Sequence, residues 1–280
     1  MVAPAEIRTG EKGCAALEVK LVFGESTVTS AFATSPMKLL TPRSRGQSVW
    51  AYTSSFGGGL VAGDETQLDL KLGANTRCFL GTQASTKVYR NPSRRPCGHR
   101  TQATLEADAV LVFAPDPVQA FANSSYAQRQ EFHLTSGAGL AFVDWFSSGR
   151  VARGERWEFE YFHSRNDVFI AGERAFVDSI RLCPEDGLLT SQHRAGRFNC
   201  FAILLLIGGP MQKAAAQLLQ EISTRPVERG GKLVCSASPV SDGALLRVAG
   251  ESVEVVGREL QRHFKCLSAL LGDDPWARKW

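Results

Sequence analysis

Short alternating or continuous apolar runs, separated by Gly, Pro, Asn and Asp, follow one another along most of the chain. Between Thr66 and Leu72 the apolar side chains fall on every second position, which is typical of a half-buried strand. Runs of this kind at fairly even spacing predict an all-β architecture. Examples of the other predicted strands are residues 18–23, 49–52, 76–80, 109–113, 130–134, 140–146, 157–162 and 198–209.

Two late segments depart from this pattern and predict helices. Residues 211–222 are rich in Ala, Gln and Leu, with Pro210 suited to the first turn. Residues 253–271 place apolar side chains on one face at helical spacing, and Gly272 suits the C-cap. We therefore expect one domain over residues 1–280, with a β-rich core at about 17–209 and a helix-containing part at 210–280.

The stretch 54–91 joins a glycine run to two alternating strands and a polar, basic end. Glycine tolerates backbone angles closed to other residues, so we expect a sharp turn or a close backbone approach at Gly57, Gly58, Gly59 and Gly63. The run lacks the lysine of a phosphate-binding loop and the spacing of a dinucleotide-binding loop. The polar stripe after it could contact a partner, line a water-filled route or be a solvated sheet edge; its residues are Gln83, Thr86, Lys87, Tyr89 and Arg90.

Three blocks resemble motifs of the UreD (UreH) family of urease accessory proteins. The first is GGGLVAGD at 57–64, followed by GTQASTKVY at 81–89, where Gly81 replaces the first Thr of the family's TTQ-x-x-TK-x-Y. The second is Pro115-Asp116-Pro117 followed by x-Y-x-Q at Tyr126 and Gln128, two side chains that share a face of an extended segment and extend the polar stripe. The third is GRVARGE at 149–155, similar to GR-x-x-x-GE.

The resemblance implies a fold and a function. The fold is an all-β-dominated, β-helix-like stack of strands with a few short helices, mainly in the C-terminal third. The function is urease maturation within nitrogen compound metabolism: a non-enzymatic chaperone that binds the urease apoprotein and, with UreF and the GTPase UreG, delivers nickel to the active site. No cofactor is tightly bound, and nickel is contacted transiently.

The acidic positions within the family motifs, Asp64 and Glu155, are the candidate contacts of a nickel conduit. Borderline divalent cations accept oxygen and imidazole ligands, and a transfer route needs weak, exchangeable sites. A simpler alternative exists for each residue: Asp64 follows Gly63 and could bond its own turn, and Glu155 lies among arginines that could form an ion pair with it.

Composition narrows the function classes. The net charge of +4 is too mild to indicate a nucleic-acid binder, and the arginines and His99 within 90–100 suggest a solvated basic loop. The seven cysteines are scattered and form no C-x-x-C pair, which argues against a disulfide framework and a zinc site and favours a reducing cytoplasm. The N-terminus lacks the apolar segment of a secretion signal, and no membrane anchor is visible.

Two other function classes stay open on the residues alone. One is a pure interaction scaffold that never touches metal. The other is an enzyme with a carboxylate pair in a β-solenoid groove, drawn from Asp116, Asp144 and Glu155. The tail with Trp276 and Trp280 could dock a partner or pack against its own domain, and exposed strand edges leave the oligomeric state open.

Overall fold

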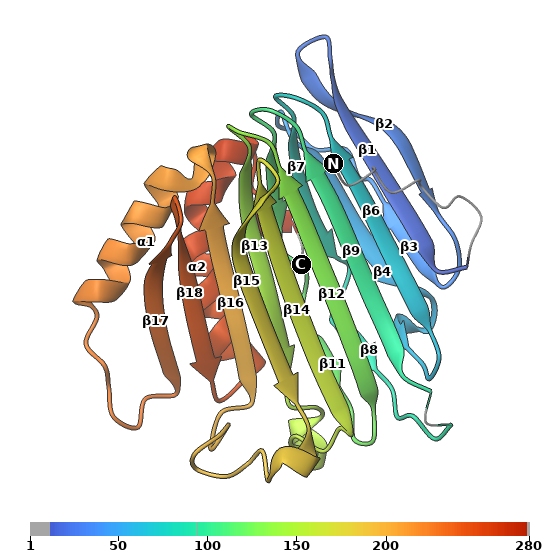
Figure 1. The fold of residues 1–280 in the computed structure, drawn as a ribbon, viewed down its shortest axis with the longest axis vertical. Helices are drawn as coiled ribbons and strands as arrows, with labels where there is room; N and C mark the ends of the chain where they lie inside the picture. Colours follow the sequence, from blue (N-terminus) through green and yellow to red (C-terminus); the bar gives the residue numbers. More distant parts are fainter. Residues whose placement is uncertain (1–11, 94, 279–280) are drawn as a thin grey trace.

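The computed structural model describes residues 12–93 and 95–278, and this part of the chain forms two large sheets (Figure 1). The seven-stranded sheet has the order β15 (Glu173–Leu182), β14 (Tyr161–Ile170), β12 (Ser125–Leu134), β9 (Cys97–Leu105), β6 (Glu65–Leu72), β1 (Cys14–Val22), β2 (Glu25–Ala33). The main path of the eleven-stranded sheet is β17 (Leu233–Val240), β18 (Gly243–Gly250), β16 (Cys200–Ile207), β13 (Gly139–Ser147), β10 (Val110–Phe113), β7 (Arg77–Thr82), β4 (Val49–Ser55), β3 (Met37–Leu40).

The middle of the molecule is a β-solenoid. Strands β6, β9, β12 and β14 pair in parallel on one side, and β4, β7, β10 and β13 pair in parallel on the other. The short parallel strands β5 (Gly59–Leu60), β8 (Thr86–Val88) and β11 (Val118–Ala120) form a third side. The chain visits the three sides in turn, so residues about one coil apart lie next to each other. The expected β-helix-like stack is confirmed.

Alternating inward side chains fill the solenoid with two apolar clusters. The larger cluster lies between the two sheets and includes Leu70, Leu105, Phe132 and Phe142. The smaller cluster lies towards the opposite end of the same strands and includes Tyr126, Phe146 and Phe162. Burial of these large side chains supplies the main driving force for the fold. A polar layer separates the two clusters.

The glycine run makes the corner that the sequence predicts. Gly57 and Gly58 have φ values of 76° and 70°, and Gly63 has a φ of 84°. Gly59 serves a different purpose: a Cβ built there would lie 2.9 Å from the Cβ of Lys87 on the next coil. Only glycine lets β5 and β8 approach this closely. Both expected uses of the run, the sharp turn and the close approach, are therefore confirmed.

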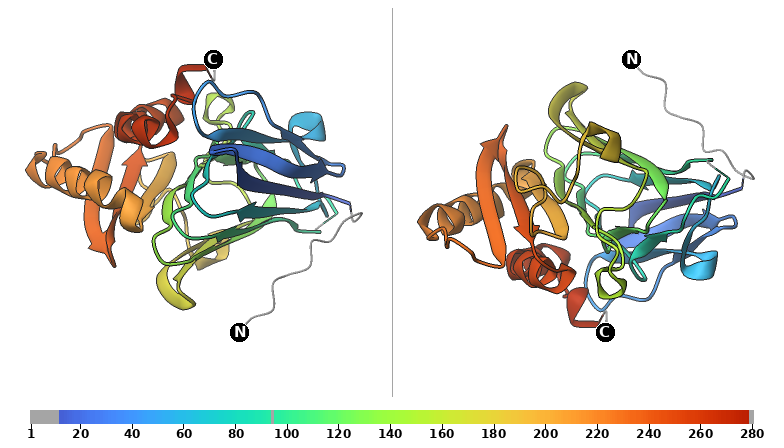
Figure 2. Two further views of the ribbon diagram at one scale, coloured as in Figure 1. Left: turned by 90° about the horizontal axis from the view of Figure 1, so that it is seen from above. Right: turned by 90° about the horizontal axis from the view of Figure 1, so that it is seen from below.

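The C-terminal part adds an antiparallel extension and two helices to the eleven-stranded sheet. Helices α1 (Gln212–Thr224) and α2 (Val253–Leu271) cover its outer face near β16, β17 and β18 (Figure 2). Ser252 caps the start of α2 by accepting a hydrogen bond from the Val255 N–H, and Gly272 ends it with a φ of 74°. The two predicted helices are confirmed. The strands β17 and β18, which lie between them in the chain, were not predicted from the sequence.

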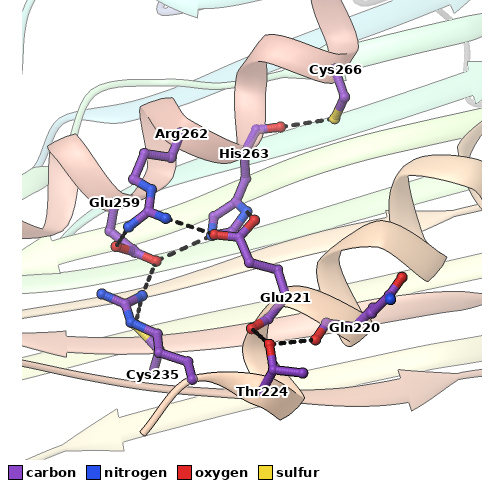
Figure 3. Close-up of polar contacts among 9 residues, drawn as sticks. Gln220, Glu221, Thr224, Cys235, Glu259, Arg262, His263 and Cys266 are labelled. Carbon is purple, nitrogen blue, oxygen red and sulfur yellow. Dashed lines mark hydrogen bonds and ion pairs between the residues drawn. The ribbon is translucent and has the colours of Figure 1, made fainter. Parts of the chain in front are cut away.

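A partly buried ionic network holds the two helices together (Figure 3). Glu259 of α2 contacts Nε2 of His263 at 3.2 Å and accepts a hydrogen bond from Arg225 at 2.5 Å. Arg262 bridges to Glu221 of α1 at 2.8 Å. Burial acts to raise the pKa of Glu259, but hydrogen bonds from His263 and Arg225 outweigh it and lower that pKa to about 2. Glu259 is therefore ionised at neutral pH.

The strand expected at 157–162 is wrong in its first half: β14 begins at Tyr161, and Trp157 has a φ of 58° within a loop. Trp157 and Phe159 are buried because this loop closes the smaller apolar cluster. Their alternating burial resembles the pattern of a strand, although the backbone forms a loop. The tail packs intramolecularly at Trp276, whose ring stacks on Phe264 at 4.4 Å, whereas Trp280 lies outside the described residues.

Candidate functional site

A pocket of about 110 Å³ opens inside the solenoid between the two apolar clusters. It is bounded by inward side chains of both sheets and of the short third side. The volume suffices for several water molecules. Its inner part is lined by Thr66, His99, Gln128, Gln130 and Asp144.

Strand register builds the inner part of the pocket. Thr66, His99, Gln128 and Ser164 occupy matching positions on β6, β9, β12 and β14, so they form one row across four parallel strands. The next inward row continues the polar character with Thr101, Gln130 and Asn166. These seven side chains, together with Asp144 from the opposite sheet, are called the polar layer here. An internal layer of this kind costs stability unless its groups are hydrogen-bonded.

Asp144 is the acceptor on which the layer converges. Its carboxylate accepts hydrogen bonds from Gln128 Nε2 at 2.7 Å, Ser164 Oγ at 2.5 Å and Asn166 Nδ2 at 2.9 Å. All three donors are neutral. Burial raises the pKa of Asp144 above its usual value, while the three hydrogen bonds oppose the rise. Asp144 is thus a buried carboxylate with no cationic partner among the described residues.

His99 is the second titratable group of the polar layer. Its Nδ1 lies 2.8 Å from the Thr66 hydroxyl and its Nε2 lies 3.0 Å from the Thr101 hydroxyl. Burial lowers the pKa of His99 to about 4, so the ring is neutral at neutral pH. The expectation that His99 belongs to a solvated basic loop is wrong, because β9 turns this side chain inward between Cys97 and Thr101.

Hydroxyl groups lead from the polar layer to the surface. The outer lining includes Thr53, Ser55, Ser85 and Thr86, all of which are partly exposed. Asp116 lies here too: its Oδ2 accepts a hydrogen bond from the Thr82 hydroxyl at 3.0 Å. The pocket therefore offers hydroxyl, carboxylate and imidazole groups, a set of ligands suited to borderline divalent cations.

The polar stripe predicted from the sequence is only partly brought into the pocket. Thr86, Tyr126 and Gln128 line it, and the shared face expected for Tyr126 and Gln128 is confirmed, since the Tyr126 hydroxyl donates to Gln128 Oε1 at 3.0 Å. The other members of the stripe lie outside the pocket lining: Gln83, Lys87, Tyr89 and Arg90. Tyr89 instead donates to the Gly57 carbonyl at 3.1 Å and supports the glycine corner.

Comparison with known proteins places the chain in a family. The family model described as UreD urease accessory protein matches residues 11–280. The chain belongs to the UreD family of urease accessory proteins. The urease accessory protein UreD of Sorangium cellulosum is 45% identical over 276 residues, which cover 98% of this chain and 86% of that protein. The UreD protein of Anaeromyxobacter sp. is 37% identical over 266 residues, covering 95% and 89%. Urease accessory protein D of Oryza sativa subsp. indica is 29% identical over 304 residues, covering 99% of each.

Membership of the UreD family excludes the enzyme among the function classes left open by the sequence. The chain is a urease maturation factor and not an enzyme. Of the three acids considered for an enzyme, Asp116 and Asp144 line the same pocket, whereas Glu155 is absent from the lining. Within residues 12–93 and 95–278, no three His, Cys, Asp or Glu side chains lie close enough to form a metal cage. No helix of that part is long and apolar enough to span a membrane.

The two acidic residues of the UreD motifs lie outside the pocket lining. Asp64 caps its own turn, because its Oδ2 accepts a hydrogen bond from the Val61 N–H at 2.9 Å. Glu155 pairs with Arg150 and also accepts from the Ala122 N–H at 3.3 Å. The hydrogen bond from Arg150 lowers the pKa of Glu155. The contacts of both residues therefore match the simpler alternatives: Asp64 bonds its own turn, and Glu155 forms an ion pair with an arginine.

The conduit hypothesis drawn from the sequence did not include Asp144 or His99, although the sequence pattern of its strand distinguishes each of them. In β13 the inward positions are Leu140, Phe142, Asp144 and Phe146, so one acid interrupts an apolar face. In β9, His99 falls on the same alternating face as Cys97 and Thr101. A charged or titratable residue on the buried face of an otherwise apolar strand is the signal that could have found both.

Proposed function

We propose that this UreD protein carries nickel to the urease active site through its polar pocket, as a cytoplasmic scaffold and conduit that binds the urease apoprotein. UreF and the GTPase UreG act with it. The observation that carries the proposal is Asp144, a buried carboxylate that lines the pocket and is held by neutral donors alone. An ionised carboxylate in such surroundings lacks a compensating charge, and an entering divalent cation provides one.

The other groups of the pocket suit a cation that passes through. A metal-binding histidine must be neutral, and His99 meets this condition at neutral pH. The hydroxyl and amide oxygens of the lining are weak ligands that exchange readily with water. A route made of such groups binds nickel strongly enough to admit it and weakly enough to release it. This combination supports transient contact rather than a resident metal.

Asp64 and Glu155 stay part of the proposal as contacts outside the pocket. Among the described residues, no donor reaches Oδ1 of Asp64, so this carboxylate has an oxygen available for a passing cation. Glu155 is the weaker candidate, because Arg150 and Ala122 already occupy its oxygens. The stripe residues outside the pocket, namely the exposed Gln83, Lys87 and Arg90 and the partly exposed Tyr89, are proposed as partner contacts.

The experiment that tests the proposed function is urease activation in cells. The urease subunits and the other accessory proteins are expressed with and without this chain, and urease activity and nickel content are measured. We expect urease to remain inactive and low in nickel when the chain is omitted. Equal nickel loading without the chain would contradict the proposal.

A scaffold that never touches metal is the second candidate function. The full hydrogen bonding of Asp144 favours it, since a satisfied polar network can serve to fix strand register alone. The two candidates differ in one outcome. A variant that assembles with its partners but fails to load nickel supports the conduit, whereas loss of assembly in the same variant supports the scaffold.

A further inference from the structure

The hairpin of β1 and β2 ends in a two-residue turn that contains an unusual residue, Phe23. Phe23 and Gly24 connect the paired residues Val22 and Glu25, with φ values of 51° and 83°. A two-residue turn with both φ values positive is of type I′, in which Asn-Gly is the preferred pair. A bulky aromatic residue at positive φ is strained, because its Cβ crowds the backbone.

The strained residue is also fully exposed. Phe23 has a relative exposure of 104%, and the neighbouring Leu21 and Val22 are 45% and 37% exposed. A Cβ built on Gly24 would meet no atom within 4 Å, so the turn stands clear of the rest of the described chain. Figure 1 shows the hairpin projecting beyond the ends of the neighbouring strands. Both the backbone conformation and the exposure are unfavourable for a phenylalanine.

The geometry of the turn does not demand an aromatic side chain. The hairpin of β14 and β15 has the same two-residue turn, with Ala171 and Gly172 at φ values of 51° and 86°. The hairpin of β17 and β18 uses Ser241 at a φ of 47°. These turns carry small or polar residues at the position that Phe23 occupies. The fold therefore does not require an aromatic side chain at this position. A residue that is unfavourable for folding and lies at an exposed tip indicates a binding role.

We propose that Phe23 is a docking anchor that inserts, with Leu21 and Val22, into an apolar pocket of the urease apoprotein. The inference rests on the proposed function in one respect, namely that the chain binds this apoprotein. An aromatic side chain buries about 150–250 Å², whereas a stable symmetric contact needs about 800 Å² per partner. Three side chains at a tip are too few for a dimer of two such tips. They can act only as one anchor within a larger interface, and urease is the client on which the maturation role of the family is defined.

The test replaces Phe23 with the residue that its turn prefers. In Phe23→Asn the strain and the exposed ring disappear together, so we expect the Tm to rise by roughly 1–3 °C. The same variant should bind purified urease apoprotein at least about tenfold more weakly in biolayer interferometry. A purely structural role of Phe23 cannot produce higher stability together with weaker binding. Phe23→Trp keeps a large aromatic anchor and should retain most of the affinity.

Ala171→Asn is the matched control. It makes the same change of residue in a turn of the same geometry, so the Tm should again rise, and the affinity for urease apoprotein should stay within about twofold of wild type. Failure of the wild-type chain to bind the apoprotein would contradict the proposed function rather than the anchor. Binding by wild type and Phe23→Asn with equal affinity would overturn the anchor alone.

Three further results would also overturn the anchor, because each assigns Phe23 to another occupant. The first is loss of UreF binding in Phe23→Asn with urease binding intact. The second is a shift of the isolated chain from dimer to monomer on substitution, measured by sedimentation. The third is binding to vesicles of phosphatidylglycerol and phosphatidylcholine that depends on Phe23, with urease binding unchanged.

Discussion

Gln128 and Asp144 lie on opposite sheets of the solenoid, and the Gln128 amide donates to the Asp144 carboxylate at 2.7 Å. Gln128 also donates to Ser164 Oγ at 2.8 Å and accepts from the Tyr126 hydroxyl at 3.0 Å. One side chain thus links the two sheets through the middle of the pocket. The side chains of the polar layer hydrogen-bond to one another, so replacing one of them removes a hydrogen-bond partner from its neighbour.

Replacing Gln128 with Leu tests this linkage. Gln128→Leu leaves the Tyr126 hydroxyl without its acceptor and removes one donor from Asp144, so we expect a loss of about 1–3 kcal/mol in the free energy of unfolding. Urea denaturation followed by circular dichroism measures it. Gln102→Leu on the outward face of β9 is the control, with an expected change below about 0.5 kcal/mol. Equal effects of the two substitutions would rule out a linked polar layer.

The ionic network under the helices predicts a dependence of stability on acid. The pKa of Glu259 is about 2 in the folded chain against 4.5 as its ordinary value, so the ionised carboxylate stabilises the fold above pH 4.5. This contribution is lost as the pH falls from about 5 towards 2. The stability advantage of wild type over Glu259→Gln should therefore be about 2 kcal/mol at pH 7 and should shrink steadily in this acid range.

Urea denaturation at pH 7, 5, 4 and 3 checks this prediction. Glu221→Gln serves as the control, because Glu221 is more exposed than Glu259 and its ion pair with Arg262 is worth at most about 1 kcal/mol. His263, Arg225 and Arg262 are unchanged in both variants. A wild-type advantage that stays constant from pH 7 to pH 3 would show that Glu259 does not stabilise the helices through its charge.

The glycine corner gives a prediction with two distinct outcomes. Gly59→Ala places a methyl group against the backbone and Cβ of Lys87, so β5 and β8 must move apart. Gly57→Ala meets open space and suffers only the strain of its φ of 76°, about 1–2 kcal/mol. Thermal unfolding should therefore show a larger fall in Tm for Gly59→Ala. The reverse order would mean that the approach of the two strands is not tight.

The sequence predicts the strands and the late helices well, because period-2 and period-3.6 patterns depend on local burial. It predicts the corner at Gly57 and Gly58 for the same reason, since only the backbone of these residues is involved. The polar layer is different. Thr66, His99, Gln128 and Ser164 are brought into one row by the register of four parallel strands, and residues from successive coils are neighbours only after folding.

The contacts of Asp144 could not be derived from spacing for the same reason. Its donors come from β12 and β14 on the opposite sheet, so its place at the centre of the layer depends on how the two sheets face each other. The family motifs direct attention to Asp64 and Glu155 instead. Their contacts with Val61 and Arg150 are local in sequence, which explains why the simpler alternatives for them were visible in the sequence.

If nickel passes Asp144 on its way to urease, as we propose, then urease matured with Asp144→Asn should contain less nickel. The substitution removes the charge at nearly constant volume, and Asp69→Asn on the outward face of β6 is the control. After co-expression with the other accessory proteins, complex assembly is checked by co-purification and nickel per urease active site is measured by mass spectrometry. We expect Asp144→Asn to assemble normally and to lower nickel loading at least about tenfold, with Asp69→Asn unchanged. Full nickel loading of urease by an assembled Asp144→Asn complex would show that nickel does not depend on Asp144.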